Sequence, residues 1–132
     1  MIGPDQFREF VQPNLREQCR WFDYSLFHLD GVDVIRHLDA LMEIDELTAL
    51  QWTAGAGKPD GGDPCWYELY DKVRRAGKSL HISVYNGSSE EIWNKCEALV
   101  KRYGCNGIYL LIPDMPVSVA REFLTKAERE WT

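Results

Sequence analysis

The pair of residues best suited to chemistry is His28 and Asp30, which stand two positions apart at the end of a short apolar segment. In a β-strand, side chains two positions apart point to the same face, so the imidazole and the carboxylate would lie side by side. Such a pair can move protons near neutral pH or bind a divalent metal, which makes both residues catalytic and metal-ligand candidates. A structural interpretation is equally open, in which His28 bonds to a neighbouring strand and Asp30 caps the loop.

Other strand ends carry side chains that could bind a ligand. Gln51 and Trp52 precede a glycine-rich loop and could hydrogen-bond to and stack on a planar molecule, although a tryptophan here is more typical of a core. Tyr85 offers a hydroxyl group at the next strand end, and we expect His81, deeper in the fold, to be buried and hydrogen-bonded. Asp114 follows the last strand, where it could face the site or cap the final helix. Sites in parallel α/β folds lie beyond these strand ends.

The elements that position these residues alternate in type along the chain. A helical segment comes first, and Pro13 is expected to interrupt it and start a second helix. Period-2 segments then predict strands at 24–29, 48–53, 78–85 and 107–112. Segments of 3–4 periodicity predict helices over 34–42, 64–76, 89–103 and 116–127, with Asp33, Asp63 and Ser88 as candidate caps. This order indicates parallel strands joined by right-handed crossovers.

Two folds accommodate four such units, an open doubly wound sheet and half of a (β/α)8 barrel. A nucleotide-binding sheet needs a glycine fingerprint, but Asp60 stands where its last glycine would be, and Pro59 follows Lys58 where a P-loop needs Ser or Thr. We therefore expect a plain flexible loop. The strand at 78–85 alternates polar with apolar residues, as near the mouth of a barrel. A TIM barrel takes about 250 residues, so we predict a single α/β domain over 1–132 that forms half a TIM barrel with an N-terminal helix.

Composition narrows the classes of partner. The formal net charge of −6 disfavours binding to nucleic acid, which needs clustered Lys and Arg. No apolar stretch is long enough to predict a membrane span, and the first residues do not resemble a secretory signal. The four cysteines form neither a C-x-x-C pair nor a zinc pattern, so we expect reduced thiols and a cytoplasmic location.

Several short motifs together resemble the C-terminal half of the uroporphyrinogen decarboxylase superfamily. They are Phe7-x-x-Phe10-Val11-x-Pro13-x-Leu15, a strand ending His28-Leu29-Asp30-Gly31, Leu50-Gln51-Trp52-Thr53, and Ala76-Gly77-Lys78. This superfamily has a TIM-barrel fold and includes the decarboxylase of haem biosynthesis and cobalamin-dependent methyltransferases. The resemblance implies a lyase or methyltransferase that acts on a tetrapyrrole or a methyl donor, with zinc or another divalent metal and a corrinoid carried by a partner protein as possible cofactors.

The chain departs from this family pattern at two points. Zinc-dependent methyltransferases of the superfamily use a His-x-Cys pair and a later Cys, whereas this chain has His28-Leu29-Asp30 and no Cys after the last strand. The decarboxylase's substrate-binding Arg and Asp motifs belong to an N-terminal half that these residues do not include. A half barrel has open edges, so the expected partner is that missing half or a second copy in a homodimer. A binding module that uses Trp52 and the glycine loop is a further alternative.

Overall fold

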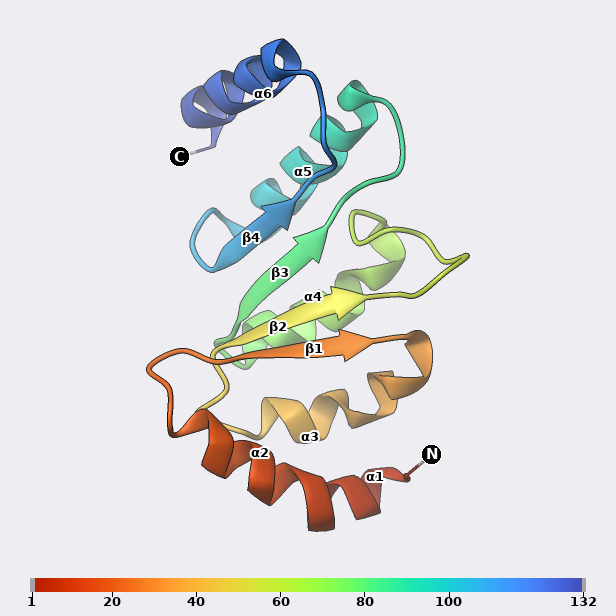
Figure 1. Ribbon diagram of the computed structural model, residues 1–132, viewed down its shortest axis with the longest axis vertical. Helices are drawn as coiled ribbons and strands as arrows, with labels where there is room; N and C mark the ends of the chain where they lie inside the picture. The colour runs from red at the N-terminus through yellow and green to blue at the C-terminus, as the bar shows by residue number, and fades with distance from the viewer. Residues whose placement is uncertain (1, 132) are drawn as a thin grey trace.

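The computed structural model describes residues 2–131, which form one parallel sheet with helices packed against it (Figure 1). The strands follow the order β1-β2-β3-β4, with bounds Leu26–Asp30, Ala49–Thr53, Ser79–Ser83 and Ile108–Leu111. Consecutive strands are neighbours throughout these residues, so the sheet lacks the reversal of strand order at which doubly wound sheets bind nucleotides. The predicted alternation of strands and helices is confirmed, and the arrangement is consistent with a half-barrel-like repeat.

In the view of Figure 1, α4 (Tyr67–Arg75) and α5 (Ser89–Tyr103) lie behind the sheet, α3 (Leu38–Met42) lies below β1, and α6 (Val117–Glu130) is at the far end beside α5. Two short helical segments precede α2, the helix before β1, and helices α3 and α4 each begin with a 3-10 turn. The full set is α1 Pro4–Gln6, the π-helical turn η1 Phe7–Val11, α2 Gln12–Cys19, the 3-10 turn η2 Val32–His37, α3 Leu38–Met42, the 3-10 turn η3 Pro64–Trp66, α4 Tyr67–Arg75, α5 Ser89–Tyr103 and α6 Val117–Glu130. One face of the sheet is therefore covered by helices.

The N-terminal helix changes type at Pro13 instead of breaking. Proline has no N–H to continue the α-helical ladder, and the turn before it, η1, is wider than an α-helix. The Phe10 carbonyl, which lies in this turn, accepts a hydrogen bond from the Asn14 side chain at 2.7 Å. The predicted interruption thus takes the form of a π-helical turn that leaves the two helices continuous.

The core lies between the covered face of the sheet and helices α3, α4 and α5. Alternate strand residues point into it because strand side chains alternate between faces. Those buried from the strands are Leu29, Leu50, Trp52, Leu80 and Ile82, and those from the helices include Leu41, Leu69, Tyr70, Val73, Ile92, Cys96 and Leu99. Full burial of a large apolar side chain stabilises a fold by about 1.5–3 kcal/mol.

Two of the three predicted caps are confirmed. Ser88 Oγ accepts a hydrogen bond from the Glu91 amide at 3.3 Å, and the Glu91 side chain accepts one from the Ser88 amide at 2.6 Å. Asp63 accepts from the Cys65 amide at 2.9 Å. The third was wrong, because η2 begins directly after Gly31, whose φ of 88° favours glycine, and Asp33 lies inside its first turn.

Candidate functional site

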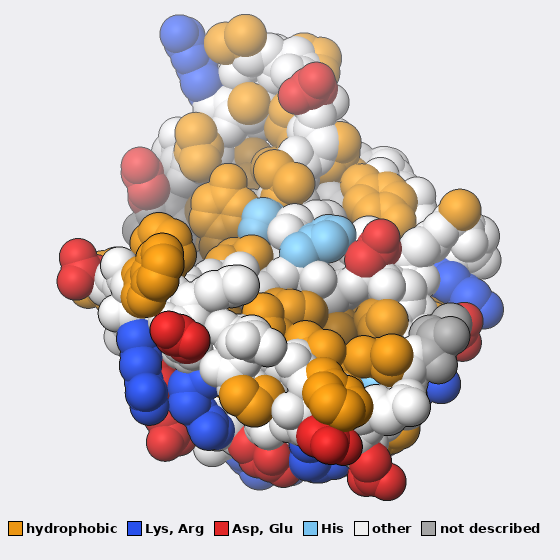
Figure 2. Space-filling view, turned by 60° about the horizontal axis from the view of Figure 1, so that its bottom comes forward, with side chains coloured by type: hydrophobic (Ala, Val, Ile, Leu, Met, Phe, Trp, Pro, Cys, Tyr) orange, Lys and Arg blue, Asp and Glu red, His pale blue; other side chains and the backbone are white. Residues whose placement is uncertain are grey.

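The uncovered face of the sheet carries one side chain from each strand at the same level. The register pairs His28 with Gln51, Gln51 with His81, and His81 with Tyr109. These four residues, called the central row below, cross the whole sheet. Figure 2 shows histidine side chains at the middle of this surface with hydrophobic atoms around them. The row brings together two of the residues predicted for the site, His28 and Gln51.

A hydrogen bond within the central row fixes the tautomer of His28. The His28 Nδ1 and Gln51 Oε1 atoms are 2.9 Å apart. An amide oxygen can only accept, so Nδ1 carries the proton and the lone pair of the neutral ring is on Nε2. This is also the bond to a neighbouring strand that the structural interpretation predicted. Because the His28 side chain is exposed, its Nε2 is open to a substrate on this face.

His81 has a different environment from His28. Its ring meets the Tyr109 ring edge-on, with centroids 4.6 Å apart, and its Nε2 is buried with no hydrogen-bond partner. The expectation of a hydrogen-bonded His81 was therefore wrong for this atom. Burial, together with the nearby His28, lowers the pKa of His81, so the ring is neutral at pH 7.

Polarity on the open face increases toward the carboxyl ends of the strands. At the amino ends, a hollow of about 450 Å³ is lined mainly by apolar and small residues, among them Leu26, Ala49 and Tyr109. The level beyond the central row holds Asp30, the hydroxyl groups of Thr53 and Ser83, and the apolar Leu111 on the edge strand β4. Asp30 is exposed and lies on the same face as His28, as the spacing of the pair predicted.

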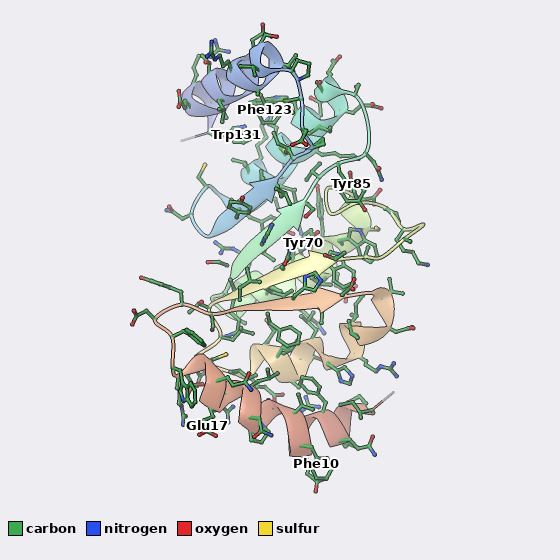
Figure 3. All side chains as sticks on the ribbon, in the orientation of Figure 1. Phe10, Glu17, Tyr70, Tyr85, Phe123 and Trp131 are labelled. Carbon is green, nitrogen blue, oxygen red and sulfur yellow. The ribbon has the colours of Figure 1, made fainter. Side chains whose placement is uncertain are left out.

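The other predicted site residues are more dispersed. Trp52 lies on the opposite, helix-covered face, only 1% exposed, with its ring 5.1 Å from that of Trp66. It belongs to the core, which was the interpretation favoured from its type. Tyr85 is half-exposed just beyond the tip of β3 (Figure 3). Asp114 is exposed, and the expectation that it caps the final helix was wrong, because Pro116 is at the N-cap of α6 with no side-chain bond.

The predicted metal ligands do not complete a site by themselves. Residues 2–131 hold no group of three or more His, Cys, Asp or Glu side chains that could bind a metal ion. Catalytic zinc has three protein ligands and structural zinc has four, so His28 and Asp30 would need further ligands from outside the described residues. We therefore derive no chemical step through a metal.

The sequence did not point to Asp60, the residue that joins the loops after β2 and β3, which form the rim of the candidate site. Asp60, the residue that excluded a glycine fingerprint, is 2% exposed and accepts hydrogen bonds from backbone amides of two loops, the one after β2 and the one after β3. The last part of the loop after β2 is accordingly not the plain flexible loop that we expected, because Asp60, Gly61 and Gly62 are buried, whereas residues 56–59 are exposed. In the sequence, the two glycines that follow Asp60 were the signal that another part of the backbone approaches closely here.

A second missed residue, Lys78, lies at the opposite end of the sheet. It is 3% exposed, and its Nζ donates to the carbonyls of Ile44 and Leu47 at 2.6 and 2.8 Å. Burial lowers the pKa of this amine. The Ala76-Gly77-Lys78 motif thus fastens the loop between α3 and β2, far from the predicted site.

Comparisons with protein-family models, with curated proteins and with solved structures find no match to this chain. What is established is the class, an α/β fold with a four-stranded parallel sheet whose strands alternate with helices. The resemblance to the uroporphyrinogen decarboxylase superfamily stays a prediction. None of the helices in the described residues has the length and apolar character needed to cross a membrane. All four cysteines are free, and Cys19 and Cys96 are buried.

Proposed function

We propose that this chain forms half of a barrel enzyme like those of the uroporphyrinogen decarboxylase superfamily and that its open sheet face lines the active site. The observation that carries the proposal is the central row, in which Gln51 holds the exposed His28 in one tautomer. Four further strands, from another part of the protein or another chain, would close the barrel.

The arrangement of the sheet supports a barrel over an open sheet. The strand order does not reverse within the described residues, and the helices that follow β1, β2 and β3 cover the same face. In a (β/α)8 barrel the interior is packed and the site lies at the carboxyl ends of the strands. The apolar amino ends of this open face, and the polar carboxyl ends of β1, β2 and β3, follow that pattern.

His28 is the proposed acid–base residue for either reaction of the superfamily. In a decarboxylation, the protonated ring would donate its Nε2 proton to the carbon that has lost carbon dioxide. In methyl transfer to a thiol, the neutral Nε2 would accept the thiol proton before the sulfur attacks the methyl group. Asp30, one level nearer the rim, would stabilise the imidazolium, and Gln51, Tyr85 and Asp114 would bind the substrate.

The substrate's carboxylates, if it has them, would need cations from outside this sheet. The strand residues on the open face include two histidines and one aspartate but neither Lys nor Arg. A tetrapyrrole bears several carboxylates, whereas a methyl group on a corrinoid carrier presents none at the reacting carbon. This favours methyl transfer as the reaction to test first.

The test is the enzymatic activity of the closed barrel, which is this chain together with the protein segment or second chain that supplies the four further strands. His28→Gln should lower the rate of methyl transfer from a methylated corrinoid to a thiol, or of tetrapyrrole decarboxylation, by about 10²- to 10⁴-fold. Asn94→Gln, on the surface of α5, is the control. A fully active His28→Ala/Asp30→Ala variant would overturn the proposal.

A second candidate is a non-catalytic half barrel that pairs with another copy of itself. Leu26, Tyr109 and Leu111 are each about half exposed on the open face, and β1 and β4 both have an unpaired edge. Two copies would place each β4 beside a β1 and bury these side chains. Light scattering of the chain alone would then give a dimer mass, and a stable monomer at low concentration would exclude it. Trp52 lies in the core, so its ring is not accessible to a ligand as a binding module built on it would require.

A further inference from the structure

We propose that Asp60 and Lys95 are positioning residues, which together hold Tyr85 and the loop after β2 in place at the rim of the site. We call these two residues the rim clamp. The inference rests on the proposed function, because a fixed rim affects catalysis only if the open face binds a substrate.

The carboxylate of Asp60 is completely enclosed and accepts hydrogen bonds from three backbone amides. Oδ2 accepts from the N–H groups of Tyr85 at 2.9 Å and Asn86 at 2.6 Å, and Oδ1 accepts from that of Gly62 at 3.1 Å. The first two amides follow β3, while Asp60 and Gly62 follow β2. One side chain therefore joins the two loops at the carboxyl ends of neighbouring strands.

Lys95 supplies the opposite charge from helix α5. Its Nζ lies 3.2 Å from each oxygen of the Asp60 carboxylate and donates to the Asn86 carbonyl at 2.7 Å. An enclosed carboxylate is stable only when it is paired and hydrogen-bonded, so the amine and the amides are needed together. Lys95 thereby fixes the loop after β3 to the helix that this loop enters.

The backbone around Gly61 fits the end of β3 with no space for a side chain. The Gly61 amide donates to the Ser83 carbonyl at 2.9 Å, and the buried Tyr70 hydroxyl donates to the Gly61 carbonyl at 2.7 Å. A Cβ atom on Gly61 would lie 2.7 Å from Ile82 and 2.8 Å from the Ser83 oxygen. Tyr70 is a fully buried residue of α4, and Figure 3 labels it in the region of β2 and β3. The loop is thus held at Gly61 as well as at Asp60.

These contacts give the rim a fixed shape before any ligand binds. The backbone of Tyr85 is anchored while its side chain remains half-exposed, so its hydroxyl is available to a substrate. Binding energy depends on such preorganisation, since a group that is already in place loses little freedom on binding. The rim clamp should therefore act on substrate binding, with no direct part in proton transfer.

Hydrogen exchange tests the clamp itself and needs no substrate. Asp60→Asn keeps the shape of the side chain but replaces one accepting oxygen with a donor, so the amides of Tyr85 and Asn86 should exchange at least about tenfold faster by NMR. Asp63→Asn is the matched control, because Asp63 lies in the same loop but accepts only from Cys65. Unchanged exchange at Tyr85 and Asn86 would overturn the proposal.

Kinetics of the assembled barrel separate positioning from a purely structural role. Asp60→Asn and Tyr85→Phe should each raise KM about tenfold and leave kcat within about twofold. His28→Gln should instead lower kcat. An unchanged kcat in His28→Gln would contradict the proposed function, whereas an unchanged KM in Asp60→Asn would contradict only the role of the rim clamp in substrate binding. Faster exchange with an unchanged KM would mean that the clamp is structural only. If Asp60→Asn does not fold, Lys95→Met gives the same two readouts, because it removes the ion pair and the bond to the Asn86 carbonyl but leaves the Asp60 carboxylate in place.

Discussion

Asp60 and Lys78 are both charged and almost fully enclosed, yet they lie at opposite ends of the same sheet. Asp60 has an oppositely charged partner, Lys95, in addition to its amide donors. Lys78 is held by two backbone carbonyls, and its pKa is lowered by burial. The cost of burying the Lys78 ammonium group, at the amino ends of the strands, is therefore offset less fully than that of burying the Asp60 carboxylate at their carboxyl ends.

The comparison indicates that the buried charge at the amino ends of the strands stabilises the fold, whereas the one at the carboxyl ends also positions loops of the candidate site. Lys78 fastens a loop below the apolar hollow, where the strands begin and no predicted site residue lies. Asp60 fastens two loops beside Tyr85, where the strands end. In parallel α/β folds, sites are built from loops at the carboxyl ends, so rigidity there can be used for binding.

The largest effect on stability is expected at Asp60. Asp60→Ala leaves the Lys95 amine and three amides without their acceptor, so it should lower the free energy of unfolding by about 4 kcal/mol. Chemical denaturation monitored by circular dichroism measures this. Asp63→Ala, which loses only a cap, should cost about 1 kcal/mol. Equal losses in the two variants would mean that the carboxyl end is not specially stabilised by its buried charge.

Lys78→Met should have a smaller effect, about 2 kcal/mol by the same measurement. The carbonyls of Ile44 and Leu47 lose their donor, but the cost of burying an ammonium group disappears with the charge. Lys72→Met is the control, because the ion pair of Lys72 with Asp39 is on the surface and is worth at most about 1 kcal/mol. If Lys78→Met cost as much as Asp60→Ala, the two ends would be equivalent.

The order of the elements could be predicted because it depends on neighbouring residues. Period-2 and period-3.6 patterns, and a cap such as Ser88 with Glu91, are local signals. Because side chains of consecutive strand residues point to opposite faces, Gln51 and Trp52 cannot both face a ligand. The core position of Trp52 could therefore be predicted from the sequence. Gly31, rather than Asp33, begins the turn after β1 because the backbone there needs a positive φ.

The rim could not be predicted from local patterns. The partners of Asp60 at Tyr85, Asn86 and Lys95 are 25, 26 and 35 residues away, so no short motif joins them. The unpartnered Nε2 of His81 likewise depends on a residue of the neighbouring strand, Tyr109. Pairings of this kind follow from the strand order and register, which the sequence alone leaves open.

Two histidines with lowered pKa values, the buried His37 and the half-buried His81, allow the same comparison between the two faces of the sheet. His37, on the covered side, stacks on Phe7 with centroids 4.6 Å apart, and His81 is on the open side. Burial is the main cause that lowers the pKa of each, with Arg36 adding to it for His37. Between the lowered pKa and the unfolded value of about 6.5, the unfolded chain binds more protons. Stability is therefore lost as the pH falls through that window, with a slope of at most about 1.4 kcal/mol per pH unit for each histidine.

The pH dependence separates these two faces when each histidine is replaced. His37→Phe should flatten part of the fall in unfolding free energy just below pH 6.5, and His81→Phe should flatten the rest, as measured by denaturation at a series of pH values. Carboxylates such as Asp71, whose pKa is lowered mainly by Arg102, act in a separate and more acidic window. An unchanged profile in both variants would show that neither ring is buried in solution.

The smallest effect is expected at the start of α5, the helix that carries Lys95. Ser88→Ala removes the acceptor for the Glu91 amide and should cost about 1 kcal/mol in unfolding free energy, whereas Ser89→Ala, one residue later and exposed, should cost less than about 0.5 kcal/mol. Amide exchange at Asn86 should stay slow in Ser88→Ala, because the Asp60 carboxylate holds that amide independently of the cap. Faster exchange there would mean that the rigidity of the carboxyl end comes through α5 and that Asp60 alone does not maintain it.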